Sequence, residues 1–221
     1  MRPARSFLHA MLTFACAAGL VVDAGAQPVT HPNLNAQLLV AARQSDVTQV
    51  KRLLALGVVA DSRNRLGKTS LIIASEKGNT EMAAPLLAAG ADVNIQSVEG
   101  VTALMAASYS GNVELVRLLL AAGARTDPLD RMQKPAVVYA AGQGNAAVLE
   151  ALLAAGIDVN ATYDHKLTLL MWSAGQGHAD AVRLLLTRGA RTDRRDDRGL
   201  TALDIANEAG KGDIARSAGL Q

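Results

Sequence analysis

The chain has 221 residues, of which 50% are hydrophobic, and this supplies one substantial core and excludes a disordered chain. Aromatic residues make up only 3%, so the core has to be built from small and branched aliphatic side chains, which favours stacked helices over a β-sandwich. The formal net charge is +2, with 22 basic and 20 acidic residues spread along the chain, which argues against a nucleic-acid partner held by charge.

The first 26 residues have the composition of a secretory signal sequence. Arg2 and Arg5 form a basic start, Phe7–Val22 is mostly apolar, and Ala24–Ala26 offers small residues to a signal peptidase. We expect cleavage after Ala26 and export to the periplasm. An uncleaved membrane anchor is the alternative, although the apolar stretch is short for a bilayer span.

The single cysteine, Cys16, lies inside this segment. A lipid anchor on Cys16 is a weaker interpretation, because the apolar run continues beyond it. Removal of the signal leaves a mature chain without a thiol, which excludes disulfides and a cysteine nucleophile. We therefore expect a short linker over residues 27–33 and then one domain, over 34–221, that is stable through packing alone.

Four sets of residues recur along this domain at an interval of 33 residues, which indicates an internal repeat. The first set holds Gly78, Gly111, Gly144, Gly177 and Gly210. The second set holds Gly57, Gly90, Gly123, Gly156 and Gly189. A third holds Thr69, Thr102, Thr168 and Thr201, with Pro135 in the missing place, and a fourth holds Asp61, Asn94, Asp127, Asn160 and Asp193.

Each period predicts two short helices. In the central one, Thr102 is a helix N-terminal signal, and Gly111 ends the helix because glycine takes a positive φ without steric cost. The second helix carries, at helical spacing, Val113, Val116, Leu119 and Leu120. Because one unit is too thin to bury its apolar face alone, neighbouring units have to stack into a solenoid.

These residues resemble the ankyrin repeat. The pattern G-x-T-x-L, A-A, G-N or G-H, and L-L-L-x-x-G-A-D-V-N is nearly intact in GVTAL, SGNVELVRLLLAAGA and AAGADVN. The resemblance covers roughly residues 34–221 and implies an all-α ankyrin-repeat solenoid with short hairpin turns. It has about six helix-turn-helix units, over about 34–66, 67–99, 100–132, 133–165, 166–198 and 199–221.

The sequence departs from the family pattern at three places. Pro85 falls inside a second helix, where we expect a kink. Gln133 and Pro135 stand where neighbouring units have Gly and Thr, which predicts an irregular hairpin. The histidine of the family's T-P-L-H motif is absent, so that we expect less rigid turns; its places are taken by Ile72, Met105, Val138, Met171 and Asp204.

The sequence contains only weak matches to nucleotide-binding, catalytic and metal-binding motifs. The run Gly142-x-Gly144-x-x-Ala147 has dinucleotide-binding spacing, but Gly144 belongs to the repeating set. Ser173 lacks the flanking glycine of a nucleophile elbow and is interpreted as a core or turn serine. The acidic residues near Asp196 alternate with arginines, which predicts a solvated charged hairpin instead of a metal site. We expect no enzyme activity, no cofactor and no metal.

The repeat register also assigns two unusual side chains. His178 replaces the asparagines that precede the other second helices, so we expect it to cap its helix. Trp172 aligns with Ile73 and Ile205 and is therefore interpreted as a core residue.

In the ankyrin family, partners contact residues that flank the Gly-x-Thr motif and the end of the first helix. Carried over to the matching positions, the resemblance assigns partner binding to Arg65, Leu66, Lys68, Glu76, Lys77, Val98, Glu99, Val101, Tyr109, Ser110, Arg131, Met132, Lys134, Gln143, Asp164, His165, Leu167, Gln176, Asp197 and Arg198, with Leu200 and Glu208 in the last unit. These positions vary between units while the core positions barely change.

We expect a monomeric protein-binding module that holds a partner in the cell envelope against its concave face. It needs no membrane after cleavage of the signal. Tyr109, Arg131 and Met132 are the expected anchors, because such side chains are enriched where binding energy concentrates. The basic side chains at the hairpins suggest an acidic patch on the partner. The alternative function is an inhibitor or regulator of an envelope enzyme.

Overall fold

The computed structural model describes residues 32–220, and the signal sequence expected over 1–26 lies outside them. The described chain is all-helical apart from one isolated bridge between Thr162 and Thr168. Its helices are α1 (Pro32–Gln44), α2 (Val47–Ala55), α3 (Ser70–Glu76), α4 (Thr80–Ala88), α5 (Ala103–Ser110), α6 (Val113–Ala121), α7 (Ala136–Gln143), α8 (Ala146–Ala154), the 3-10 helix η1 (Asp164–Lys166), α9 (Leu169–Gln176), α10 (Ala179–Thr187), α11 (Ala202–Glu208) and α12 (Gly212–Ser217). Among residues 32–220, no helix has the length and apolar character required to cross a bilayer.

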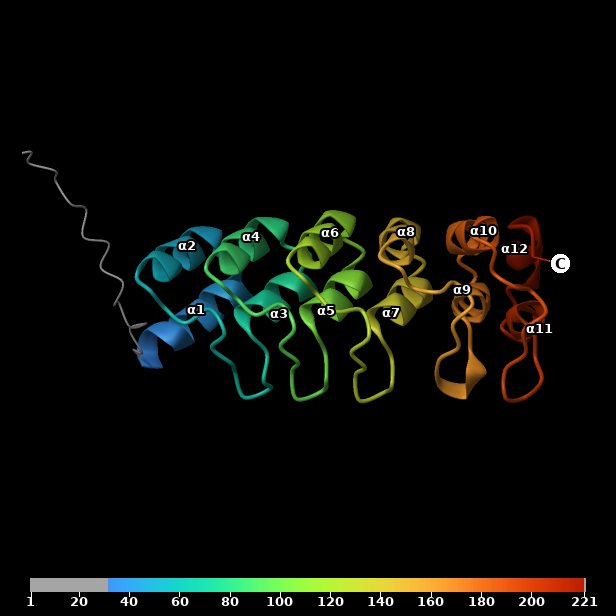
Figure 1. Ribbon diagram of the computed structural model, residues 1–221, viewed down its shortest axis with the longest axis horizontal. Coiled ribbons are helices and arrows are strands. Elements are labelled where there is room, and N and C mark those ends of the chain that lie inside the picture. The colour runs from blue at the N-terminus through green and yellow to red at the C-terminus, as the bar shows by residue number, and fades with distance from the viewer. Residues whose placement is uncertain (1–31, 221) are drawn as a thin grey trace, which may run out of the picture.

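The α-helices form two layers (Figure 1). The odd-numbered helices make the first layer, the even-numbered helices make the second, and the hairpins project from the side of the first layer. Each first-layer helix contacts the first-layer helix of the next unit, and it also contacts the second-layer helix of its own unit. This arrangement confirms the predicted all-α solenoid of helix-turn-helix units.

The core lies between the layers and between successive units. In the central unit Leu104 and Ala107 of α5, and Leu115 and Leu119 of α6, are at most 1% exposed. Full burial of a leucine side chain stabilises the folded state by about 2 kcal/mol. Because the same registers are buried in neighbouring units, the units form one continuous apolar core.

The first-layer helices begin at the predicted threonines. The hydroxyl oxygens of Thr69, Thr102, Thr168 and Thr201 each accept a hydrogen bond from the backbone N–H three residues later. Such caps satisfy one of the free N–H groups at a helix start. Gly111 ends α5 in the left-handed conformation, at φ 78°, as the sequence predicted.

Three of the residues that replace the T-P-L-H histidine supply a hydrogen-bond acceptor. The Sδ atoms of Met105 and Met171 each lie 3.4 Å from the backbone nitrogen of the capping threonine. Asp204 accepts from the Thr201 backbone N–H at 2.9 Å and from its hydroxyl at 2.7 Å. Hydrogen bonds therefore take the place of the absent histidine contact at these three turns, and the lower rigidity of the turns stays a prediction.

The two other local departures are accommodated by the backbone. α4 continues as one helix through Pro85, with the Ala89 N–H bonded to the Pro85 carbonyl at 3.0 Å. In the fourth unit Gln133 adopts the left-handed conformation at φ 56° and donates its N–H to the Asp130 carbonyl at 3.0 Å. Gly100 makes the equivalent bond in the preceding unit, so the prediction of an irregular hairpin was wrong.

His178 does not cap its own helix. Its side chain makes no hydrogen bond to the start of α10, and its Nε2 lies 2.9 Å from the Gly142 carbonyl of the preceding unit. Asn112 and Asn145 make comparable bonds to carbonyls of the units before them, at 2.7 and 3.0 Å. The capping prediction was therefore wrong for His178, although Asn79 and Asn112 at the same register do accept the N–H three residues later and cap their helices.

Candidate functional site

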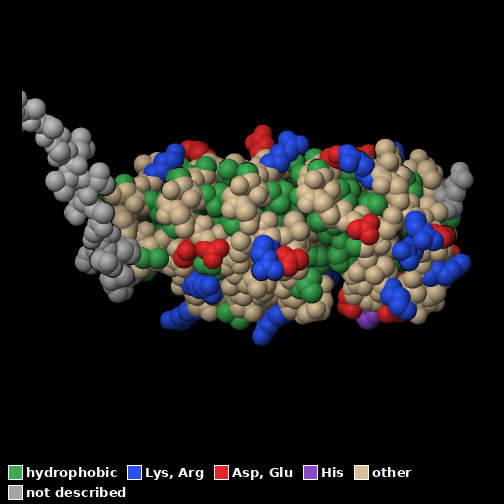
Figure 2. Space-filling view, in the orientation of Figure 1, with side chains coloured by type: hydrophobic (Ala, Val, Ile, Leu, Met, Phe, Trp, Pro, Cys, Tyr) green, Lys and Arg blue, Asp and Glu red, His purple; other side chains and the backbone are tan. Residues whose placement is uncertain are grey.

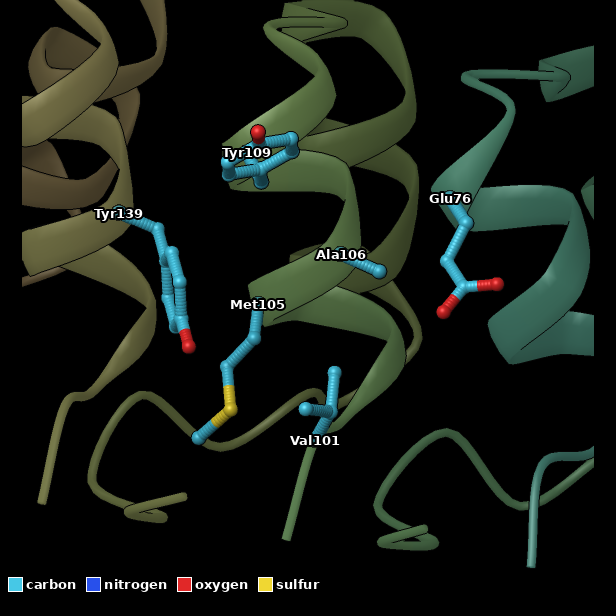
Figure 3. A pocket seen from close by; sticks show the side chains of 6 residues that line it. All are labelled: Glu76, Val101, Met105, Ala106, Tyr109 and Tyr139. Atoms are coloured by element: carbon cyan, nitrogen blue, oxygen red, sulfur yellow. The ribbon is translucent and has the colours of Figure 1, made fainter. Parts of the chain in front are cut away.

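A groove runs along the angle between the hairpins and the first-layer helices. We call it the inner groove and define it by three hollows. The first, of about 310 Å³, is lined by Glu76, Val101, Met105, Ala106, Tyr109 and Tyr139 (Figure 3). The second, of about 210 Å³, is lined by Tyr109, Lys134, Val138, Tyr139, Gly142, Gln143, Trp172 and Gln176. The third, of about 380 Å³, is lined by Arg131, Met132, Gln133, Lys134, Asp164, His165, Leu167 and Trp172.

Aromatic side chains gather in the inner groove. Residues 32–220 contain four aromatic side chains, and three of them, Tyr109, Tyr139 and Trp172, line it. The rings of Tyr109 and Tyr139 meet edge to face, with centroids 6.1 Å apart and planes at 79°. Tyr109 is 57% exposed and lines the first hollow together with Tyr139 (Figure 3). The groove therefore presents aromatic surface to solvent at its centre.

A buried carboxylate holds Tyr139 in place. One oxygen of Asp130 accepts the backbone N–H groups of Met132 and Lys134, each at 2.8 Å, and its other oxygen accepts the Tyr139 hydroxyl. Burial, and then this hydrogen bond to Asp130, raise the pKa of Tyr139 above its ordinary value. Tyr139 is thus a neutral donor at physiological pH, and its bond connects the hairpin to α7.

Lys134 covers the face of Trp172, with its Nζ 4.8 Å from the ring centroid. A cation at this distance is attracted by the electron-rich face of the indole ring. Trp172 packs against the core but is only partly buried and also lines two of the hollows, so its interpretation as a core residue holds only in part. Ile73 and Ala106 are buried at the same register, where the larger rings of Tyr139 and Trp172 extend into the groove.

An acidic patch on the partner was predicted from the basic side chains at the hairpins. Two of these side chains already form ion pairs with carboxylates of the chain itself. Lys68 Nζ lies 2.5 Å from a Glu76 oxygen, and an Arg131 guanidinium nitrogen lies 3.1 Å from Glu99. Across the face in Figure 2, basic and acidic side chains alternate and no large area of one sign forms. The exposed charge of this surface is therefore smaller than the sequence suggests.

The last two hairpins pair through charged side chains. Lys166 Nζ lies 3.1 Å from Asp197, and the His165 carbonyl accepts the Asp197 backbone N–H at 3.2 Å. Asp196 is 6% exposed and so is not a solvated member of this cluster, contrary to the sequence interpretation. Burial acts to raise its pKa, but hydrogen bonds from the Leu200 and Arg198 N–H groups and the Arg198 side chain lower it overall.

All twenty residues assigned to partner binding are at least partly exposed. The structure brings part of this set together around the three hollows, namely Glu76, Val101, Tyr109, Arg131, Met132, Lys134, Gln143, Asp164, His165, Leu167 and Gln176. Asp197 and Arg198 line a further hollow of about 420 Å³ with His165, Leu167 and Asp196. The remainder lie on the hairpins or at the ends of the first-layer helices, namely Arg65, Leu66, Lys68, Lys77, Val98, Glu99 and Ser110.

The assignment from sequence missed Tyr139, Trp172 and the supporting Asp130. The signal that could have found the two aromatics is their size, since each replaces a smaller side chain that is buried in the second and third units, Ile73 and Ala106. Ser173 is fully buried and donates to the Ala141 carbonyl at 3.3 Å, as expected for a core serine. Within residues 32–220 no cluster of three potential metal ligands occurs.

The family model described as ankyrin repeats (3 copies) matches residues 12–97, 38–130, 85–163 and 137–217. The crystal structure of EF0377, an ankyrin repeat protein, is similar with a TM-score of 0.74 and 29% identity, over 82% of this chain and 96% of that one. The human ASB11 ankyrin repeat domain is similar with a TM-score of 0.69 and 26% identity, over the same shares of the two chains, 82% and 96%. No curated protein matched. With family matches across most of its length, the chain belongs to the ankyrin repeat family.

Proposed function

We propose that the protein is exported and holds a partner protein of the cell envelope in its inner groove. Ankyrin repeats are generally protein–protein interaction modules. The observation that carries the proposal is the gathering of Tyr109, Tyr139 and Trp172 in one open groove. Aromatic side chains dominate binding energy at protein interfaces, and a long open groove suits a polypeptide better than a small molecule.

The test is affinity capture from an envelope extract of the producing organism. We expect the purified protein to retain one stoichiometric partner, and the Tyr109→Ala, Arg131→Ala double variant to lose it. Glu114→Ala with Arg117→Ala is the matched control, because both side chains are exposed on α6 in the second layer. Capture that survives the groove variant, or that the control variant abolishes, would remove the groove as the binding site.

Export and the consequence of binding need separate measurements. Mass spectrometry of the protein isolated from the periplasmic fraction should give a chain that begins at Gln27, and a full-length chain would contradict cleavage after Ala26. If the captured partner is an enzyme, its assay with and without added protein distinguishes an inhibitor from a passive binding module.

A further inference from the structure

We propose that the centre of the inner groove takes an extended peptide segment that places an apolar side chain against Tyr109 and Tyr139 and a carboxylate at Lys134. This inference rests on the proposed function and adds the chemistry of the bound segment. It follows from the partners of the charged groups, from the continuity of the groove and from its apolar lining.

The carboxylates around the centre of the groove already have partners within the chain. Glu76 pairs with Lys68 at 2.5 Å, and Glu99 pairs with Arg131 at 3.1 Å. Asp130 accepts two backbone N–H groups and the Tyr139 hydroxyl. Among the described residues, no unpaired carboxylate therefore lines the first two hollows, and Asp164, in the third hollow, lies beside His165 at 3.5 Å.

Lys134, unlike these carboxylates, has no partner of opposite charge among the described residues. Among the described residues no carboxylate lies within ion-pair distance of its Nζ, which instead covers the Trp172 ring at 4.8 Å. Its side chain is half-buried, so the ammonium group has lost part of its hydration, while an aromatic face supplies only part of the compensation. An ammonium group has three hydrogen-bond donors, and a carboxylate from a partner would accept from one or two of them.

The apolar hollow and this cation belong to one channel. The first and second hollows share Tyr109 and Tyr139, and the second and third share Lys134 and Trp172. Met105 lies between Tyr139 and Val101 at the base of the first hollow, which makes the lining there largely apolar (Figure 3). One bound chain can therefore reach both features.

The length of the channel favours an extended peptide. Tyr109 and Trp172 lie on α5 and α9, two units apart. Packed helices are separated by roughly 8–10 Å, so two steps span roughly 16–20 Å. An extended chain rises by about 3.3 Å per residue and covers this span with five or six residues.

The chain provides its own reporter, because Trp172 is the single tryptophan in the sequence and lies in the groove. The purified protein is used to select from a random twelve-residue peptide library displayed on phage, and the enriched peptides are synthesised and titrated while Trp172 fluorescence is recorded. We expect enriched peptides with Asp or Glu within three residues of a large apolar side chain, and a saturable fluorescence change.

Two matched changes test the charge. Lys134→Glu should weaken binding at least tenfold, whereas Lys51→Glu should leave it unchanged, because Lys51 is exposed on α2 in the second layer. Replacing the acidic residue of the peptide by its amide should cause a similar loss with the protein unaltered, so the test does not depend on the fold of the variant.

Enrichment of basic or purely apolar peptides, absence of any enriched peptide, or equal affinity for the amide peptide would overturn the inference. These outcomes are independent of the capture experiment. If the full-length partner is still captured through the groove, the proposed function stands and only the acidic–apolar chemistry fails.

Discussion

The two sides of the first-layer helices obey different constraints. On the side that faces the core, the register of Leu104 holds an aliphatic residue in every complete unit, namely Leu71, Val137, Leu170 and Leu203. On the side that faces the groove, the register of Tyr109 holds Glu76, Gly142, Gly175 and Glu208. A side chain enclosed by neighbours on both sides has to match their shape, whereas one at the groove is free to vary. The stack thus separates positions that are fixed by packing from positions that are free to vary within a single short helix.

The largest expected effect comes from the core side of the central unit. Leu119 is fully buried on α6, a helix that contacts both α4 and α8, so Leu119→Ala should lower the free energy of unfolding by roughly 2–5 kcal/mol through the cavity that it leaves. Leu53 occupies the same register in the first unit and is 1% exposed. Leu53→Ala should cost less, because an end unit can fray locally. Urea unfolding followed by circular dichroism measures both values, and equal losses would contradict a stack of nearest-neighbour contacts.

A smaller loss is expected where the hairpin supports the groove. Asp130→Ala removes the acceptor of two backbone N–H groups and of the Tyr139 hydroxyl, and should cost about 1–3 kcal/mol. Ser97 holds the equivalent place in the preceding unit and accepts only the Val101 N–H, at 3.2 Å. Ser97→Ala should therefore cost less than Asp130→Ala in the same urea experiment. If the two losses are alike, the bonds of Asp130 to the Met132 N–H and to the Tyr139 hydroxyl together contribute nothing measurable.

The last hairpin allows a test by pH. The pKa of Asp196 is lower in the folded chain, so the stabilisation from its carboxylate is present above the ordinary carboxyl pKa and is lost as the pH falls toward the folded value. Asp196→Asn should lower the free energy of unfolding at pH 7, by less than Asp130→Ala, because the amide keeps one acceptor oxygen. The variant should also lose less stability than the parent between pH 5 and strong acid. Parallel pH profiles would show that the carboxylate charge is not involved.

The repeat interval explains why the fold could be predicted and part of the site could not. Core contacts recur at each period, so Thr102 and Gly111 indicate a helix start and end whatever the neighbours are. The contacts that shape the groove involve individual side chains, such as Lys134 on Trp172, which are in adjacent units. The prediction that His178 caps its helix was wrong for the same reason, since its hydrogen bond to the preceding unit depends on how far the imidazole reaches.

The smallest expected effect concerns the two neighbouring hairpins that share one backbone conformation. Gln133 is exposed at φ 56°, a conformation that costs a residue with a Cβ roughly 1 kcal/mol of folded-state stability. Gln133→Gly removes this strain but gives the unfolded chain more conformational freedom. The net gain in unfolding free energy should be at most about 0.5 kcal/mol. Gly100→Ala should be unfavourable, because its Cβ would lie 2.9 Å from the Asp130 Cα. A loss of stability in Gln133→Gly would mean that the Gln133 side chain, which lines the third hollow, itself stabilises the groove.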